Sequence, residues 1–155
     1  MAAVEVKGLR ELNAALAELP ERIAKNVLRG SVAAGAAVIR KEAVKRAPIY
    51  TGPVAQGHPP PGTLKRAIYQ TQVRELSGLL KQTFKVAVRR GKGAATKSGK
   101  SLDAYYARFV EYGTVKMTAR PFMRPAFDSQ KLNAIEAMKQ YLAKRIPEEA
   151  AKLKR

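Results

Sequence analysis

The sequence predicts a single α+β domain, in which a small antiparallel β-sheet packs against two or three α-helices. Its 155 residues are enough for one domain with its own core. Along three segments apolar residues recur every three or four positions, which is the spacing of one helix face. Between them the apolar period shortens to two, as on half-buried strands. These changes of period predict helices near 9–19, 21–46 and 125–146 and strands near 67–73 and 83–88.

The segment 21–46 carries the longest helical pattern. Its apolar positions form two neighbouring stripes, an arc wider than a lone surface helix needs. Gly30 and the small residues 33–37 would let another backbone approach closely. We favour burial of this face against the chain's own sheet over packing on a neighbouring subunit. Pro20 ends the preceding helix or opens this one, because proline fits the first turn of a helix.

The two central strands are expected to form a hairpin. Ser77 and Gly78 lie between them and favour a turn. On 83–88, three alternating apolar side chains share one face. Two further strands are expected, one at 4–6 and one at 115–120.

Residues 1–147 are expected to form the domain, and 148–155 a charged tail. Pro147 marks the boundary because it interrupts the pattern of the last helix. Two irregular segments lie within the domain, a Pro-rich arm at 48–63 and a basic loop at 89–101.

The Pro-rich arm contains five prolines, three glycines and no residue of the charged types. This proline density excludes a helix or a central strand, and long loops of this kind are usually functional or disordered. We therefore place a candidate subunit interface here, and interpret the lone histidine as a solvated loop residue. The candidate interface residues are Pro53, His58, Pro59, Pro60 and Pro61.

The basic loop belongs to a strongly cationic stretch. Residues 64–100 carry 10 basic and 1 acidic side chain, in a chain of net charge +18. Such a stretch attracts a polyanion, either nucleic acid or an acidic protein surface, and a solvated mobile loop is the alternative. With no zinc-finger or RNA-binding motif, any DNA contact would be to phosphates and indifferent to sequence. The candidate DNA-facing residues are Arg89, Arg90, Lys92, Lys97 and Lys100.

The composition argues against an enzyme. One histidine and no cysteine exclude a His- or Cys-based metal site and a thiolate nucleophile. There is no phosphate-binding glycine loop, and the carboxylates lack metal-ligand spacing. We predict no catalytic residues, no cofactor and no metal. Glu111, an acid within an apolar run, is expected to be a structural residue paired with an arginine.

The sequence also predicts no contact with a membrane. No apolar stretch approaches the 18 residues of a membrane-spanning helix. The N-terminus lacks the uninterrupted apolar run of a signal peptide. The protein is expected to stay in the compartment where it is made.

A long aromatic and proline-rich motif lies in the second half of the chain. It reads YARFVEYGT at 106–114 and ARPFMRPAF at 119–127, and is preceded in order by Ala47-Pro48, Thr51-Gly52 and LKRAI. These motifs resemble those of the head–tail joining and tail-completion proteins of long-tailed double-stranded DNA phages. One difference is the insertion of the arm between the Thr-Gly pair and LKRAI.

The resemblance implies a structural virion protein of the neck or tail top, assembled in the host cytoplasm. It would form a homo-oligomeric ring, six-fold or twelve-fold, that joins the head connector to the tail. Its neighbours would be head-completion or connector proteins and tail-terminator or tail-tube proteins. Packaged double-stranded DNA would pass through the ring, so the basic loop would meet phosphates if it faced the lumen. The alternative is a free basic protein that binds DNA without regard to sequence.

The aromatic-proline motif is expected to be structural. The rings of Phe109, Tyr112, Phe122 and Phe127 should be mostly buried and should hold the last helix on the body. The residues of this structural motif are Tyr106, Phe109, Glu111, Tyr112, Gly113, Pro121, Phe122, Pro125 and Phe127.

The arm yields the first testable prediction. Deletion of residues 53–61 should leave the subunit folded and weaken ring formation, because a proline-stiffened arm loses little entropy on docking. Thermal melting followed by circular dichroism would report folding, and light scattering after size exclusion would report the oligomer. Intact rings after the deletion would contradict the interface.

Overall fold

The computed structural model describes residues 20–51, 59–91 and 103–153, together with the isolated residues 10, 14 and 17. The expected strand at 4–6 lies outside the described residues. Of the helix expected at 9–19, only the three isolated residues are described, and all three are helical. The elements are α2 (Glu21–Arg46), α3 (Thr63–Ala67), β1 (Ile68–Gln72), the 3-10 turn η1 (Arg74–Leu76), β2 (Phe84–Val88), α4 (Ala107–Tyr112) and α5 (Met123–Leu153).

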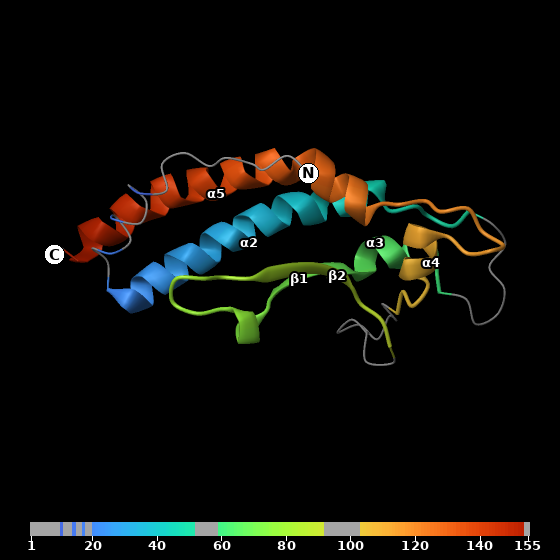
Figure 1. Cartoon of the computed structure of the whole chain (residues 1–155), viewed down its shortest axis with the longest axis horizontal. Helices are drawn as coiled ribbons and strands as arrows, with labels where there is room; N and C mark the ends of the chain where they lie inside the picture. The colour runs from blue at the N-terminus through green and yellow to red at the C-terminus, as the bar shows by residue number, and fades with distance from the viewer. Residues whose placement is uncertain are drawn as a thin grey trace.

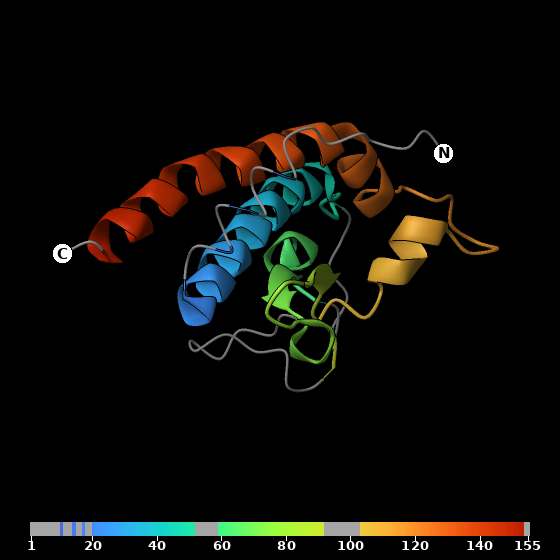
Figure 2. The same cartoon turned by 60° about the vertical axis from the view of Figure 1, so that its left-hand side comes forward.

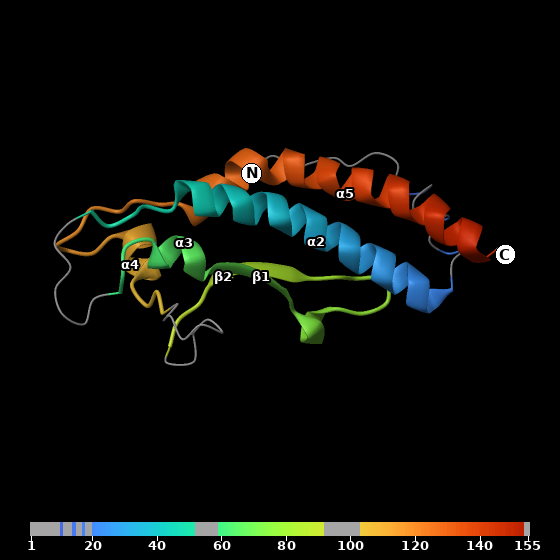
Figure 3. The same ribbon diagram turned by 180° about the vertical axis from the view of Figure 1, so that it is seen from behind.

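Two long helices dominate the α+β fold. α2 and α5 run side by side in opposite directions, and the β1–β2 hairpin lies on the other side of α2 (Figures 1 and 3). α2 is therefore the middle layer, which explains the wide apolar arc of its sequence. The side-chain amide of Gln70 on β1 donates to the carbonyl oxygen of Ala33 on α2, with the two atoms 3.1 Å apart. The expected packing of α2 on the sheet is thus confirmed, but the face that carries Gly30 and Gly35 packs on α5 and not on the sheet.

Two glycines set how closely the long helices approach. A Cβ on Gly30 would lie 2.1 Å from the hydroxyl oxygen of Tyr141 and 2.4 Å from the adjoining ring carbon. A Cβ on Gly35 would lie 2.2 Å from Cε of Met138 and 3.1 Å from the carbonyl oxygen of Ala134. The side chains of α5 thus occupy the space that larger residues on α2 would fill.

The two strands form the antiparallel hairpin that the alternating pattern predicts. Ile68 pairs with Val88 and Gln72 with Phe84, and the backbone N–H of Val73 donates to the carbonyl of Thr83 beyond the last pair. The first strand begins one residue later than expected, at Ile68.

Residues 63–67 form the short helix α3, which the sequence analysis did not predict. Gly62 precedes α3 with φ of +76°, in the left-handed region that glycine tolerates. This turn places Leu64 and Ala67 against the core. The expected strand at 115–120 is also absent from the described residues, where a single bridge joins Thr114 and Met117.

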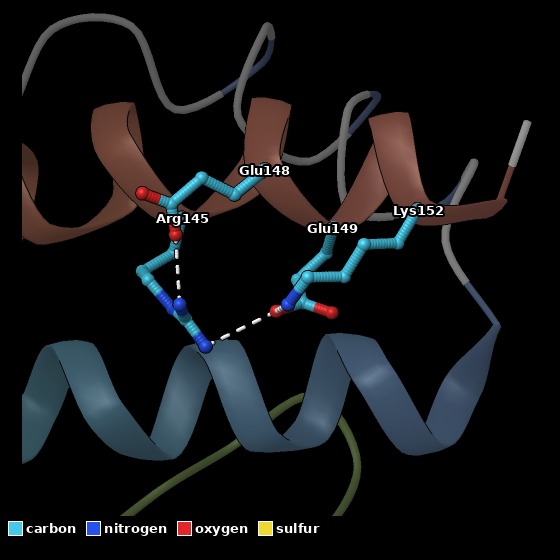
Figure 4. A network of polar contacts seen from close by, with 4 residues as sticks. All are labelled: Arg145, Glu148, Glu149 and Lys152. Carbon is cyan, nitrogen blue, oxygen red and sulfur yellow. Dashed lines mark hydrogen bonds and ion pairs between the residues drawn. The ribbon is translucent and has the colours of Figure 1, made fainter. Parts of the chain in front are cut away.

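The last helix is longer than expected, because α5 continues through Pro147 to Leu153. Proline cannot donate to the preceding turn. Two side-chain ion pairs connect residues on either side of it, from Arg145 to Glu148 at 2.7 Å and to Glu149 at 3.1 Å (Figure 4). Beyond the proline, Lys152 contacts Glu149 at 2.9 Å. The hydrogen bond with Glu148 raises the pKa of Arg145, and that with Lys152 lowers the pKa of Glu149. These contacts favour helical backbone beyond the proline.

The core lies where the ends of several elements meet. α3 and the start of β1 pack there against the C-terminal end of α2, and α4 lies beside the first turns of α5 (Figure 2). Phe122 is the largest fully buried side chain, with 1% of its surface exposed. The other buried members are Ala43, Ala47, Leu64, Ala67, Ile68, Ala104 and Ala126.

The expected burial of the four aromatic rings is confirmed for Phe122 alone. Phe109 is half-buried, whereas Tyr112 is 65% and Phe127 53% exposed. The buried face of α5 includes Ala126, which directs Phe127 about 100° around the helix and away from α2. The expectation was therefore wrong for Tyr112 and Phe127, which face outward from this subunit.

The close contact between α2 and α5 leads to a prediction on the free energy of unfolding. Gly35→Ala should lower the free energy of unfolding by about 1–3 kcal/mol, because Met138 must repack against a nearby backbone carbonyl. Gly78→Ala is the matched control, since no atom lies within 4 Å of its Cβ position and its φ is not positive. The control should be neutral or slightly stabilising. Urea unfolding of both variants tests this, and equal losses would show that the glycine contact is unimportant.

Candidate interaction site

Glu111 anchors the start of α5 from the last turn of α4. Its Oε2 accepts hydrogen bonds from the backbone N–H groups of Phe122 at 2.8 Å and Met123 at 3.0 Å, and its Oε1 accepts one from Arg124 at 3.1 Å. The first N–H groups of a helix have no partner within the helix, and a carboxylate there also interacts favourably with the helix dipole. The structural role expected for Glu111 is thus present, but its main partners are backbone amides and not an arginine side chain.

The same contacts set the ionisation of Glu111. Burial of this residue, only 8% exposed, opposes its charge. The hydrogen bonds from Met123, Phe122 and Arg124, with the nearby Arg124 charge, outweigh burial and lower the pKa of Glu111. The carboxylate is therefore ionised at neutral pH and suited to hold a helix end, and it is poorly suited to act as a base.

The chain between α4 and α5 is folded back tightly. Gly113 has φ of +77°, and a Cβ there would lie 2.9 Å from both the nitrogen of Ala119 and the carbonyl oxygen of Met117. The N–H of Arg120 donates to the carbonyl oxygen of Val110 at 2.8 Å. This reversal brings Phe122 beneath Glu111.

The two prolines of the motif flank the capped helix end. Pro121 directly precedes Phe122, and Pro125 lies in the first turn of α5, where its missing N–H would have no helical partner in any case.

At the start of α4, burial raises the pKa of Tyr106, and a hydrogen bond to the backbone of Leu64 partly offsets this.

The two ends of the basic loop are held together. Asp103 Oδ1 accepts hydrogen bonds from the N–H groups of Gly91 at 2.9 Å and Tyr105 at 3.1 Å, and Ala104 donates to the carbonyl of Arg89. Of the five candidate DNA-facing residues, Arg89 and Arg90 are described and both are exposed. Lys92, Lys97 and Lys100 lie outside the described residues.

Arg89 is placed against the sheet. Its guanidinium lies 4.8 Å from the ring centre of Tyr69, a cation–π contact. Its exposed face remains available to an anion, because a stacked guanidinium keeps its in-plane donors.

The C-terminal end of the Pro-rich arm is attached to α3. The carbonyl of Pro60 accepts from the N–H of Thr63 at 3.1 Å and from its hydroxyl at 2.6 Å. The carbonyl of Pro61 accepts from the guanidinium of Arg66. Pro59 is half-buried, while Pro60 and Pro61 are exposed. Two further interface candidates, Pro53 and His58, lie outside the described residues.

A pocket of about 380 Å³ opens between β2, α4 and the start of α5. Three guanidinium groups and two tyrosines contribute to its lining: Arg90, Arg108, Arg124, Tyr105 and Tyr112. Within the described chain none of these arginines forms an ion pair. Its floor includes Glu111 and Phe122, so the capped helix end also shapes the pocket.

Aromatic rings hold two of the pocket arginines in place. Arg124 lies 4.8 Å from the ring centre of Tyr112, and Arg108 lies 4.9 Å from that of Phe109. The sequence analysis missed both arginines. For Arg108 the available signal was its place among aromatic residues in YARFVEY, four positions before Tyr112 on the same helix. Arg124 lies in the separate PFMRPAF run, and only the folded chain brings it to Tyr112.

The exposed large apolar side chains include two local groups, and further single ones are Ile49, Tyr50, Phe127, Leu132 and Leu153. The hairpin tip, defined as residues 74–80, exposes Leu76, Leu79 and, at 85%, Leu80. The pocket rim, defined as the exposed apolar residues beside the pocket and on the turn after α4, comprises Tyr105, Tyr112, Val115 and Met117.

The described residues offer no group of acidic or imidazole side chains that could hold a metal ion. Nor is any described helix long and apolar enough to cross a membrane. The chemistry that this part of the chain presents is that of a contact surface, with cationic, aromatic and aliphatic groups side by side.

Comparison with known proteins identifies one family. The model of the HK97-gp10-like family, described as "Bacteriophage HK97-gp10, putative tail-component", matches residues 10–113, about two thirds of the chain. No curated protein and no solved structure matches the chain significantly. The matched segment runs from before α2 to the end of α4 and includes Glu111.

The capped helix end generates a prediction on stability. Glu111→Gln should lower the free energy of unfolding at pH 7 by about 2 kcal/mol, the scale of a hydrogen bond to a charged group. Glu136→Gln, on the exposed side of α5, is the matched control and should change little. Urea unfolding of the two variants provides the comparison.

The effect of Glu111→Gln on stability should depend on pH, because the pKa of Glu111 is lowered in the folded chain. Because the folded pKa of Glu111 lies below the unfolded value of about 4.3, its stabilisation is complete above that value and is lost as pH falls through the folded pKa. The stability difference between wild type and Glu111→Gln should therefore shrink in acid. A difference that stays constant from neutral pH to strong acid would contradict the charge-based cap.

Proposed function

We propose that this chain, which belongs to the HK97-gp10-like family of bacteriophage tail components, forms a homo-oligomeric ring at the head–tail junction of the virion. The family consists of structural virion proteins and not of enzymes. In this proposal the ring, six-fold or twelve-fold, joins the head connector to the tail. Its neighbours are head-completion or connector proteins on one side and tail-terminator or tail-tube proteins on the other.

The observation that carries the ring is the presence of two unlike exposed apolar patches. A closed ring is built from head-to-tail contacts, so each subunit must present two different surfaces that fit each other. The hairpin tip and the pocket rim meet this requirement, because the exposed apolar residues of the tip are all leucines whereas half of those of the rim are tyrosines. They also lie apart along the length of the subunit, since the hairpin turns back far from α4 (Figures 1 and 3).

The basic loop supports a second part of the proposal, contact with packaged DNA in the ring channel. Arg89 and Arg90 are exposed and form no ion pair within the described chain. Many copies of the loop around one duplex would strengthen a weak single contact. The alternative function, a free sequence-independent DNA-binding protein, uses the same charges without a ring.

Oligomeric state tests the ring. Leu80→Asp should weaken self-association about tenfold or more and leave the melting temperature nearly unchanged, because the side chain is exposed in the subunit but desolvated in the contact. Leu132→Asp, at an exposed leucine of α5, is the matched control. Light scattering would be measured on the purified protein, alone and with connector and tail proteins added. A monomer under all these conditions would refute the ring.

Duplex binding tests the DNA contact. The protein should retard random-sequence duplex DNA at low salt, and retardation should fall steeply as salt rises, since each neutralised phosphate releases counterions. Arg89→Ala with Arg90→Ala should reduce this binding, whereas Lys139→Ala with Lys144→Ala, on exposed positions of α5, should preserve it. Equal loss with both pairs would assign the effect to net charge alone.

A further inference from the structure

We propose that the hairpin tip of one subunit docks into the arginine-lined pocket of the next, with Glu75 entering among the guanidinium groups. This inference rests on the proposed ring and deepens it by naming the two surfaces that meet. It commits the pocket to one occupant, a second copy of this chain.

The hairpin tip has the composition of an inserted segment. η1 places Glu75 next to Leu76, and both are exposed. The carboxylate of Glu75 forms no ion pair within the described chain. Leu79 and Leu80 follow in the same turn and are also exposed. The tip thus presents one anionic group beside aliphatic side chains, with the exposed Arg74 directly before it.

The turn is also internally braced. The hydroxyl of Ser77 donates to the carbonyl of Val73 at 2.7 Å, and the N–H of Thr83 donates back to that hydroxyl at 3.0 Å. The N–H of Gly78 donates to the carbonyl of Lys81 at 2.7 Å. A braced turn loses less conformational entropy on docking than a flexible one.

The pocket has the complementary composition. Arg90, Arg108 and Arg124 line it and form no ion pair within the described chain, and two of them are held by stacking on aromatic rings. Glu111 also lines the pocket near Arg124, but its carboxylate is occupied by the backbone N–H groups at the start of α5. A guanidinium offers paired donors that match the two oxygens of a carboxylate. Tyr105 and Tyr112 line the same pocket and are exposed, so they can cover leucine side chains as the carboxylate enters.

Acids are scarce on this chain, which makes the pairing selective. There are 12 acidic residues against 30 basic ones, so most surfaces of a second copy would repel the three arginines. Glu75 is the only acidic residue between 64 and 100 in the sequence. A DNA duplex could satisfy the arginines, but it offers no group for the exposed leucines, which would remain in water.

The two surfaces lie at separate places on one subunit. In Figure 1 the short green turn that contains η1 lies below the middle of α2, while α4 lies toward the opposite end of the hairpin. The contact is therefore one between subunits, and repetition of it generates a ring or a filament, depending on the angle between copies.

The absence of cysteine allows a direct test. Leu80→Cys and Tyr112→Cys proteins would be purified separately, mixed and joined with a short bismaleimide. Because the tip of one copy meets the rim of the next, we expect cross-linked heterodimer in several-fold excess over either homodimer. A mixture of Leu132→Cys with Tyr112→Cys is the matched control and should give no such excess. A doubly substituted Leu80→Cys, Tyr112→Cys protein should give a ladder that ends at the size of the closed ring.

Charge reversal gives an independent measurement. Glu75→Arg and Arg108→Glu should each weaken self-association at least tenfold, and the doubly reversed chain should recover most of it. Glu136→Arg is the control for an exposed glutamate of α5 and should have no effect. A fold defect would lower the melting temperature and would not be rescued by the second reversal.

The outcomes separate this inference from the ring itself. Oligomers without the tip–rim cross-link, or without rescue in the doubly reversed chain, would overturn the docking and leave the ring intact. A second measurement follows the amide signals of the pocket residues by nuclear magnetic resonance. If these signals shift with short duplex DNA or with an unrelated acidic peptide, but not with a hairpin peptide that contains Glu75, the docking is also overturned. A chain that remains monomeric throughout would refute the ring and the docking together.

Discussion

The carboxylate of Glu111 accepts three backbone hydrogen bonds at the start of α5, and the remaining architecture depends on this contact. It determines where the 31-residue helix begins and in which direction it leaves the core. It also brings Phe122 into the middle of the buried cluster. Without a partner, several N–H groups at this helix end would be buried or would need water, at a cost in free energy.

The helix that begins there then packs along α2 for most of its length. Glycines on α2 make that contact close, and the hairpin occupies the opposite face of α2. The core is small and rich in alanine, so much of the stabilisation comes from close approach of backbones and not from large side chains. Because few large apolar side chains are buried in this core, the leucines and tyrosines that stay exposed are candidates for contacts with another protein.

The exposed leucines and tyrosines are the groups through which the proposed ring would form. The family is one of tail components. In the proposed ring, these surfaces contact other copies of the chain. The cap at Glu111 contributes to this as well, because the first turn of α5 places Arg124 on the pocket wall and against Tyr112. In the proposed docking, residues of the structural motif therefore also belong to the contact surface.

Local sequence periodicity determined the α+β class, the extent of α2 and the pairing of the two strands, because these depend on interactions between near neighbours and on one buried face. It also placed Glu111 in a structural role and located the basic segment. Tertiary structure alone decided the rest. The partner of Glu111 is a backbone end 11 to 13 residues away, which no side-chain pattern encodes. The exposure of Tyr112 and Phe127 depends on which face of α4 and α5 meets the core. The pocket depends on arginines from α4, from α5 and from the segment after β2, which only the folded chain brings together. α5 continues through Pro147, where ion pairs from Arg145 across the proline favour helical backbone, and a rule based on proline alone cannot include those contacts.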